Sequence, residues 1–592
     1  MLSHRIHQFV RKLILGLRHS LSDRQFFIVS SVLVGLSSGL VAVLLKAVVH
    51  EIATLVGAYS AGNNYFWFFA LLPLAGIILA TVYATKILKE EIPKGSSEIQ
   101  YNIAKKSSLL SRSQMYSHAV TSSVTVGFGG SMGLESPMVS TGAAIGSNYA
   151  RAYTMSYRDR TVLLACGAAA GIAAAFNAPI AGVLFAIEVV LTDISLTAFI
   201  PLIIAAASGA LVSKMILREG LVMTFALRQP FNYANVPMYV LLGVLAGMIS
   251  LYYVRTFQRT HRWVSGYRNM WARAVIGGLL LALIMVFFPP LFGEGYQTVS
   301  VLANATPELL TTHSIIGHWM RGPWLLLGFL VGAMLLKSFA AGLTLGGGGN
   351  GGNFAPSLFV GAYLGFAFAR LVNLTGLLVI PETNFALVGM AGVLSGVFYA
   401  PLTAIFLIAE VTGGYELMIP LMIVSALSLA IARYFEPLSM EAKKLAEKLN
   451  HSIENRDQFL LSKLELSKLI ETDFLPVKAD DTLQSLVMVI SRSHRNTFPV
   501  VNDDNELVGL VHLDHVRATI FQRELYESVR VKDLMVVPAA VISPNENLDA
   551  VLRKFDQAHQ WNLPVVEDKK YAGFVSKSSI LSKYREELMN NM

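Results

Sequence analysis

From Phe26 to about Arg433 the chain is a series of apolar runs that few acidic residues interrupt. Some runs, such as 27–49, hold the ~20 apolar residues that a helix needs to cross a bilayer. Others, between 95 and 215 and between 346 and 434, are short pieces separated by glycine and proline breaks. Broken helices at membrane depth are tolerated only where protein buries them or where they line a polar cavity. The pattern therefore predicts a helical membrane protein with a pathway inside it.

The most informative break is segment 127–137, which contains four glycines, one acid and one proline. A carboxylate at membrane depth is costly, so Glu135 is a candidate functional residue. The glycines permit close backbone approach, and Pro137 suits the first turn of a helix. Such a helix would direct its free N–H groups and positive dipole end at the place that Glu135 faces. An anion and the Glu135 carboxylate would compete for that place.

This break recurs in the second half of the chain. The sequence GLESP at 133–137 matches GNFAP at 352–356, and NAPIAGVLFAIEV at 177–189 matches YAPLTAIFLIAEV at 399–411. From proline to proline, the two motifs are 42 residues apart in the first half and 45 in the second. Paired interruptions in two halves are the best sequence indication of a transporter binding site. The whole block is therefore predicted to be repeated.

Charge and cysteine content limit the other possibilities. The net charge of +8 gives no reason to expect nucleic acid as a partner, because many of the basic residues flank the first spans. By the positive-inside rule they predict a cytoplasmic N-terminus. Segment 8–17 has the spacing of an amphipathic helix on the inner membrane surface, within an N-terminal region 1–24. The single cysteine, Cys166, excludes an intrachain disulfide and a cysteine-based metal cage, and we expect no metal site.

After the last apolar run, a second repeat of soluble composition begins. The sequence TFPVV at 497–501 aligns with NLPVV at 562–566, with an offset of 65 that falls to 64 after one deletion. Each unit is predicted to form helix, strand, turn, strand and helix, and two such units commonly pack as a pair. We expect a linker helix at 437–470, a first unit at 471–525 and a second at 530–588.

These motifs resemble the ClC family of chloride channels and proton-coupled chloride exchangers, followed by a tandem pair of CBS domains. GLESP at 133–137 resembles the family's G-[KR]-E-G-P, and GNFAP at 352–356 resembles its G-x-F-x-P. The resemblance implies an α-helical polytopic membrane protein with an inverted internal repeat of broken helices and a C-terminal α/β CBS pair. It also implies a homodimer in which each subunit has its own anion pathway. The transmembrane domain is expected at 25–436, with halves at about 25–215 and 236–436.

In the family, the glutamate of G-x-E-x-P is the gate, which here is Glu135. Deprotonated, it would occupy the outer anion site; protonated or displaced, it would admit chloride, because a helix N-terminus favours an anion over a neutral acid. The resemblance implies that backbone N–H groups bind chloride and that side chains wall the site. The anion-binding residues expected on this basis are Gly133, Leu134, Ser96, Phe354, Ala355 and Ile187.

The chain departs from the family pattern around this site. Ser136 replaces the usual glycine, and Leu134 replaces the basic residue. The family's serine motif is represented by PKGSSE at 93–98, where Ser96 is either the anion ligand or an N-cap. The family's tyrosine that closes the inner side of the pathway is missing from this chain, and Ser439 or Glu441 is the candidate for its position.

The last departure bears on mechanism. Exchangers of the family usually carry an inner proton-accepting glutamate where this chain has Val189, next to Glu188. A valine cannot relay a proton, so a passive chloride channel is favoured. The alternative is a proton-coupled chloride antiporter, because some exchangers lack that acid. Glu188 and Glu410 are expected to bond backbone at helix ends.

Two further function classes lack the residues they need. A CBS-bearing divalent-cation transporter would need clustered carboxylates in the spans, and an intramembrane enzyme would need a nucleophile–base or metal pair; the chain offers neither. The CBS pair of related proteins binds adenine nucleotides or regulates gating. The usual ribose-binding Asp is not evident, since Asp514 is displaced by one position. The nucleotide candidates are His512, His515, Ser576 and Ser579, and dimerisation or mechanical coupling is favoured over nucleotide binding. No cofactor is expected to be required.

Overall fold

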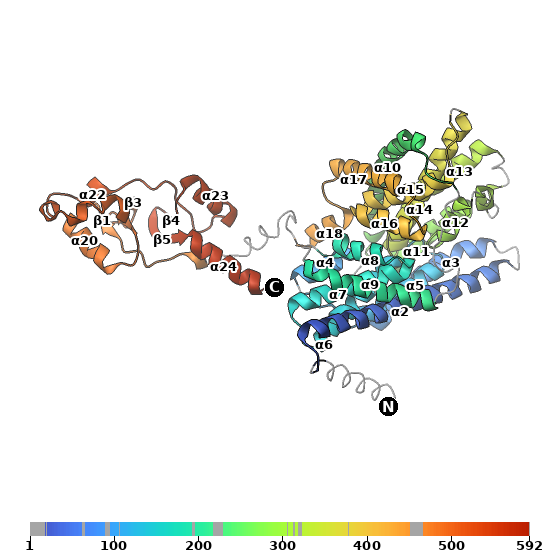
Figure 1. Cartoon of the computed structure of the whole chain (residues 1–592), viewed down its shortest axis with the longest axis horizontal. Coiled ribbons are helices and arrows are strands. Elements are labelled where there is room, and N and C mark those ends of the chain that lie inside the picture. Colours follow the sequence, from blue (N-terminus) through green and yellow to red (C-terminus); the bar gives the residue numbers. More distant parts are fainter. Residues whose placement is uncertain are drawn as a thin grey trace. The chain divides into compact units, whose positions relative to one another are not determined.

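The chain forms two units, Met1–Leu449 and Asn450–Met592. The computed structural model describes residues 18, 20–61, 66–88, 95–105, 107–191, 196–216, 229–304, 306–311, 314–317, 322–376, 378–449 and 466–590. The expected amphipathic helix at 8–17, and most of the N-terminal region 1–24, lie outside these residues, as does the middle of the expected linker helix. Figure 1 shows the first unit as a helical bundle and the second as a mixed unit of helices and strands.

All the elements described in the first unit are helices, which turns and loops connect. Its first half contains α2 (Asp23–Ala61), α3 (Phe66–Val82), η1 (Tyr83–Leu88), α4 (Ser96–Lys105), α5 (Gln114–Gly127), α6 (Glu135–Ala152), α7 (Tyr157–Phe176), α8 (Pro179–Phe185), η2 (Ala186–Val190) and α9 (Leu196–Ile216). Its second half contains η3 (Tyr233–Asn235), α10 (Val236–Ser265), α11 (Met270–Phe287), η4 (Pro289–Leu291), α12 (Tyr296–Ala303), η5 (Pro307–Thr311), α13 (Pro323–Gly346), α14 (Phe354–Thr375), α15 (Glu382–Phe398), α16 (Pro401–Val411), α17 (Met418–Phe435) and α18 (Met440–Leu449).

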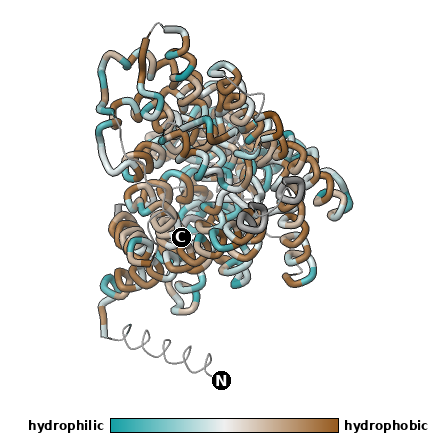
Figure 2. The backbone as a smooth tube through the Cα atoms, turned by 90° about the vertical axis from the view of Figure 1, so that its right-hand side faces the viewer, coloured by the Kyte–Doolittle hydropathy of each residue, from teal (hydrophilic) through white to brown (hydrophobic). Residues whose placement is uncertain are grey.

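Nine helices of the described part are long and apolar enough to cross a membrane. Figure 2 shows long hydrophobic stretches along many helices. The first span, α2, has an outward stripe of apolar residues at four-residue spacing: Leu36, Leu40, Leu44 and Val48. Its opposite face carries Gly35 and Gly39, whose backbones touch Ala205 and Gly209 of α9. Small residues four apart let helix backbones approach closely in a membrane, which explains why these two spans pack together.

The predicted repeat is present in the helix packing. Gly142 and Gly146 lie seven and eleven residues after the start of α6, and each meets the backbone of α7. Gly361 and Gly365 lie the same distances after the start of α14 and meet the backbone of α15. A side chain at any of these positions would fall within 2.5 Å of the partner backbone, so the two helix pairs have the same close crossing.

The breaks after these pairs also match. Helix α7 ends at Asn177 with φ 53°, and α15 ends at Tyr399 with φ 59°, both left-handed. In each half an alanine follows, with φ −126° at Ala178 and −125° at Ala400, and a proline then starts a short helix, α8 or α16. Left-handed residues end helices, and proline suits the first helical position, so this sequence turns the chain sharply. Asn-Ala-Pro and Tyr-Ala-Pro therefore form the same turn in the two halves of the chain.

The second unit contains the two predicted strand pairs. Its elements are η7 (Leu466–Leu469), β1 (Val477–Lys478), α20 (Leu483–Arg492), β2 (Thr497–Val501), β3 (Leu507–His512), α21 (Leu513–Val516), η8 (Thr519–Phe521), η9 (Arg523–Leu525), α22 (Val531–Leu534), α23 (Leu548–Ala558), β4 (Asn562–Glu567), β5 (Lys570–Ser576) and α24 (Lys577–Asn590). Strands β2 and β3 are antiparallel, as are β4 and β5, and β1 pairs in parallel with β2. Each antiparallel pair has a register shift after its first motif valine, at Val500 and at Val565. The two repeats therefore have the same local fold.

Candidate anion-binding site

The two glycine breaks meet directly. Gly133 and Gly352 form an antiparallel bridge, in which each backbone N–H donates to the other's carbonyl oxygen. Helix α6 starts two residues after Gly133, and α14 starts two residues after Gly352. The bridge therefore brings two helix N-termini, with their free N–H groups, to one place.

Glu135 lies at that place, as the first residue of α6, and only 2% of its surface is exposed. Its Oε1 accepts a hydrogen bond from the Tyr296 hydroxyl. Its Oε2 lies beside the N-terminus of α14: a Cβ added to Gly133 would be 2.2 Å from that oxygen and 3.1 Å from the Ala355 nitrogen. The carboxylate thus sits where an anion would meet both helix ends.

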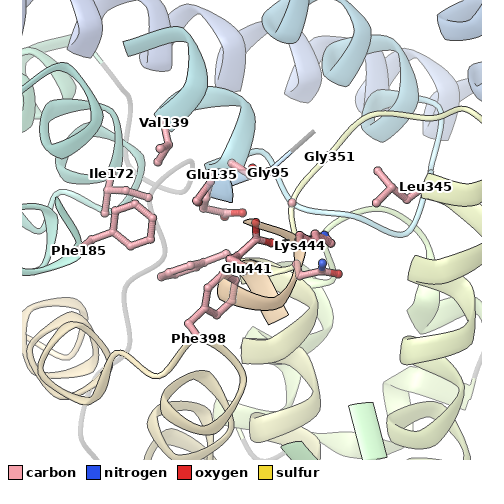
Figure 3. Close-up of a pocket in the computed structure, with 15 residues that line it drawn as sticks. Gly95, Glu135, Val139, Ile172, Phe185, Leu345, Gly351, Phe398, Glu441 and Lys444 are labelled. Carbon is pink, nitrogen blue, oxygen red and sulfur yellow. Dashed lines mark ion pairs between the residues drawn. The ribbon is translucent and has the colours of Figure 1, made fainter. Parts of the chain in front are cut away.

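A narrow cavity of about 30 Å³ begins at Glu135. Phe354, Phe185 and Phe398 line it, and the Phe354 ring centroid is 6.1 Å from that of Phe185 and 5.5 Å from that of Phe398. Figure 3 shows Phe185 and Phe398 with Glu135 around this space. The volume is enough for a particle about the size of a water molecule.

The other end of the cavity is formed by α4 and α18. Ser96, the first residue of α4, lines the cavity together with Gly95. Glu441, in the first turn of α18, lines it too, and its Oε2 accepts the Ser97 N–H at 2.9 Å. Lys444 is also among the lining residues, and its Nζ is 3.5 Å from the Glu441 carboxylate.

Four charged or polar residues beside Glu135 were not predicted from the sequence: Lys46, Glu294, Tyr296 and Lys337. The Glu294 carboxylate accepts the Leu134 N–H at 3.2 Å and interacts electrostatically with Glu135 and both lysines. The ammonium groups of both lysines are held by backbone carbonyls, Lys46 by Ala175 and Lys337 by Gly293. The signal was available, because a lone lysine in an apolar run is a functional candidate by default.

Glu188 and Glu410 bond backbone, and they do so across the two halves. Glu188 accepts the N–H groups of Leu402 and Thr403 at the start of α16. Glu410 accepts those of Ile180 and Ala181 at the start of α8. Glu188 lies in η2, a π-helical segment of a kind often found at functional sites. The expectation of backbone bonding at helix ends agrees with these contacts.

The remaining pathway candidates are placed as follows. Ile187 packs against the hydrophobic core, but the cavity is lined by Phe185 instead. Val189 is buried, and its carbonyl accepts a hydrogen bond from Gln100 of α4. Ser439 precedes α18, where its Oγ accepts the Ala442 N–H, and it is not among the cavity-lining residues.

The nucleotide candidates occupy the ends of the two strand pairs. His512 ends β3, and its ring is 5.3 Å from that of His515 at an edge-to-face angle. Burial, together with the neighbouring His515, lowers the pKa of His512. Ser576 ends β5, donates to the Glu471 carboxylate at 2.6 Å and accepts the Ser579 N–H. The Ser576 hydroxyl is therefore engaged within the unit.

A helical unit with two related halves, and a buried carboxylate held between two helix N-termini, is the architecture of a membrane protein with a candidate anion site. Residues 76–433 match the voltage gated chloride channel family, and 466–521 and 531–586 match the CBS domain. The chain belongs to the ClC family, whose members transport anions across membranes, and it carries a tandem CBS pair.

Curated relatives and solved structures agree with this assignment. A putative chloride channel protein, ClcB-like, from Ralstonia nicotianae is 30% identical over 67% of this chain and 87% of the relative. The voltage-gated ClC-type chloride channel ClcB of Escherichia coli is 30% identical over 53% of this chain and 72% of the relative. The fold is similar to that of a slow cyanobacterial Cl−/H+ antiporter, with TM-score 0.62, 22% identity and coverage of 74% of this chain and 100% of the other. The fold is also similar to that of a eukaryotic CLC transporter, with TM-score 0.59, 19% identity and coverage of 96% of this chain and 98% of the other.

Proposed function

We propose that the protein carries chloride through a pathway in each subunit and that Glu135 gates it. The observation that supports this most is the Glu135 carboxylate at the meeting point of α6 and α14. An ionised Glu135 fills the place that favours an anion, and a protonated Glu135 no longer competes for it. Chloride flux therefore increases as the pH falls.

Passive conduction is the favoured mode, because Val189 stands at the inner position where a proton-accepting glutamate would be needed. The second candidate is proton-coupled antiport. It is favoured by Glu441, a carboxylate that lines the same cavity as Glu135. The similar fold of a Cl−/H+ antiporter is compatible with either mode.

The test uses purified protein in liposomes with a chloride gradient and no pH gradient, while chloride and proton movements are recorded together. A passive channel releases chloride without moving protons uphill. Uphill proton movement driven by chloride would replace the channel proposal with the antiporter. The Glu135→Gln variant is expected to lose the pH dependence of flux, and wild-type behaviour in this variant would remove Glu135 from the mechanism.

We also propose a homodimer in the cell (inner or plasma) membrane with both termini in the cytoplasm. The basic residues around the first spans support the cytoplasmic N-terminus. For the CBS pair we propose dimerisation and mechanical coupling rather than adenine nucleotide binding. This choice is supported by the engaged Ser576 hydroxyl, which already contacts Glu471 and Ser579. Calorimetric titration of the whole protein with ATP tests whether the CBS pair binds nucleotide, and saturable binding would overturn this proposal.

A further inference from the structure

The segment 291–296, which joins η4 to α12, lies along the gate segment 127–137. A Cβ added to Gly129 would be 2.0 Å from the Phe292 ring, so the two segments are in close contact. Hydrogen bonds join them in register: Leu291 to Ser131, Gly293 to Gly129, Glu294 to Leu134 and Tyr296 to Glu135. The segment 291–296 is therefore a fixed wall beside the gate.

Glu294 is the charged residue that this wall presents to α6. Its neighbours Gly293 and Gly295 have φ 62° and 90°, left-handed conformations that favour glycine. The turn directs the Glu294 carboxylate to the N–H of Leu134, the N-cap of α6, at 3.2 Å. One carboxylate therefore stands at the end of α6, while that of Glu135 reaches the end of α14.

Two lysines, Lys46 and Lys337, supply positive charge beside these carboxylates. Lys337 is fully buried, and its Nζ donates to the carbonyls of Gly293 and Leu291 at 3.0 and 3.4 Å. Lys46 donates to a carbonyl of α7, and its Nζ is 5.8 Å from the Phe176 ring centroid. Carbonyl oxygens and an aromatic face both favour the charged ammonium. The group Lys46, Lys337, Glu135 and Glu294 thus holds two charges of each sign.

The balance of this group changes when Glu135 takes up a proton. Two lysines then face one carboxylate, Glu294, so one entering anion restores neutrality. An anion must bind firmly enough to enter a pathway and weakly enough to leave it. Two lysines and two helix ends without a carboxylate would attract the anion more strongly, because the repulsion from Glu294 would be absent.

We propose that Glu294 is an affinity-determining residue, an inference that rests on the proposed function. Its carboxylate stays at the end of α6 when Glu135 opens, because the turn and the bonds of the segment 291–296 hold it there. It repels the bound chloride, lowers the affinity for it and speeds its release. Lys337, which anchors the same segment, acts in the opposite direction.

The test measures chloride binding by calorimetry to the full-length protein in detergent, in a Glu135→Gln background where residue 135 carries no charge. E135Q/E294Q is expected to bind chloride about tenfold more tightly than E135Q, because one nearby negative charge is lost. E135Q/K337M is expected to bind it more weakly by a similar factor. The matched control is E135Q/E308Q, because Glu308 has an exposed side chain and interacts with Arg370 of α14. It is expected to bind chloride as E135Q does.

Opposite effects of the two variants are the signature of charge, since a merely structural role would weaken binding in both. Weaker or unchanged binding by E135Q/E294Q would overturn the proposal and leave Glu294 as a cap of α6. In liposomes, E135Q/E294Q is expected to have a lower maximal chloride flux than E135Q, and an equal or higher flux would contradict faster release.

If K337M fails to fold, E135Q/E294Q/K337M removes one charge of each sign and is expected to bind chloride as E135Q does. Binding as tight as that of E135Q/E294Q would exclude Lys337 from the proposal. Failure of the proposed function is distinguishable: none of the variants would then bind chloride, whereas binding that ignores both charges overturns this inference alone.

Discussion

Gly133 and Gly352 each donate a backbone N–H to the other's carbonyl oxygen, at 2.9 and 2.8 Å. These bonds tie together the segments that lead into α6 and α14, so the two helix ends cannot separate without breaking both. Opening is therefore expected to move the Glu135 side chain rather than the backbone that surrounds it.

The Gly133→Ala variant tests the space that the gate needs. The new Cβ would lie 2.2 Å from Glu135 Oε2 and 2.8 Å from the Ala355 Cβ. Because crowding of this kind costs about 1–3 kcal/mol, Glu135 is expected to leave its position and chloride flux at neutral pH to rise. The rise in flux is measured as chloride efflux from liposomes at neutral pH. Gly328→Ala in α13, where a Cβ meets nothing within 4 Å, is the control and is expected to leave flux unchanged.

The Tyr296→Phe variant removes the hydroxyl that donates to Glu135. A hydrogen bond to an ionised group is worth about 1.5–3 kcal/mol, so the ionised, closed gate loses stability relative to the protonated one. The pH below which flux increases is expected to move upward by about one unit or more. A flux–pH profile measures the shift, and an unchanged midpoint would show that the hydroxyl does not stabilise the closed gate.

Lys46→Met tests the buried charges beside the gate. Lys46 interacts electrostatically with Glu294 and Glu135, and removing one member of a buried ionic cluster typically costs about 3–5 kcal/mol. Thermal unfolding in detergent is expected to occur at a clearly lower temperature. The double variant K46M/E294Q removes one charge of each sign and is expected to recover much of the loss. No recovery would mean that Lys46 acts through packing alone.

The lowered pKa of His512 predicts that the folding stability of the CBS pair depends on pH. Its pKa is lowered in the folded unit, so the unfolded chain, with a histidine pKa of about 6.5, binds more protons. Folding stability from this residue is therefore present above pH ~6.5 and is lost as the pH falls through the lowered pKa. Scanning calorimetry of the full-length protein follows the CBS transition. H512Q is expected to reduce the loss, whereas H494Q, at an exposed position, is not.

Much of the membrane unit was predictable because its signals are local. Glycines, prolines and a single acid mark each break, and the matching motifs in the two halves predicted the paired helix ends at Glu135 and Phe354. The same holds for the two strand pairs, whose Pro-Val-Val motifs indicated equal folds. Each of these features depends on residues that are close together in the chain.

The rest depends on tertiary packing. Lys46 and Glu294 come from distant segments, and their meeting at Glu135 follows only once α2 and the loop before α12 are placed. The choice between Ser439 and Glu441 was open because it depends on where α18 begins. Helix α18 begins at Met440, so the Ser439 hydroxyl caps it, and Glu441 in its first turn reaches α4.

The exchange of carboxylates between the two halves has a consequence for biosynthesis. Glu188 caps α16, and Leu402, which it binds, is made 214 residues later. At about 5–20 residues per second, the ribosome needs roughly 10–40 s to reach it. During that interval the start of α8 also lacks Glu410, so the newly inserted first half has helix ends and an acid that only the second half can satisfy. The first half is therefore expected to need shelter from lipid, by the insertion machinery or a chaperone, until synthesis of the second half is complete.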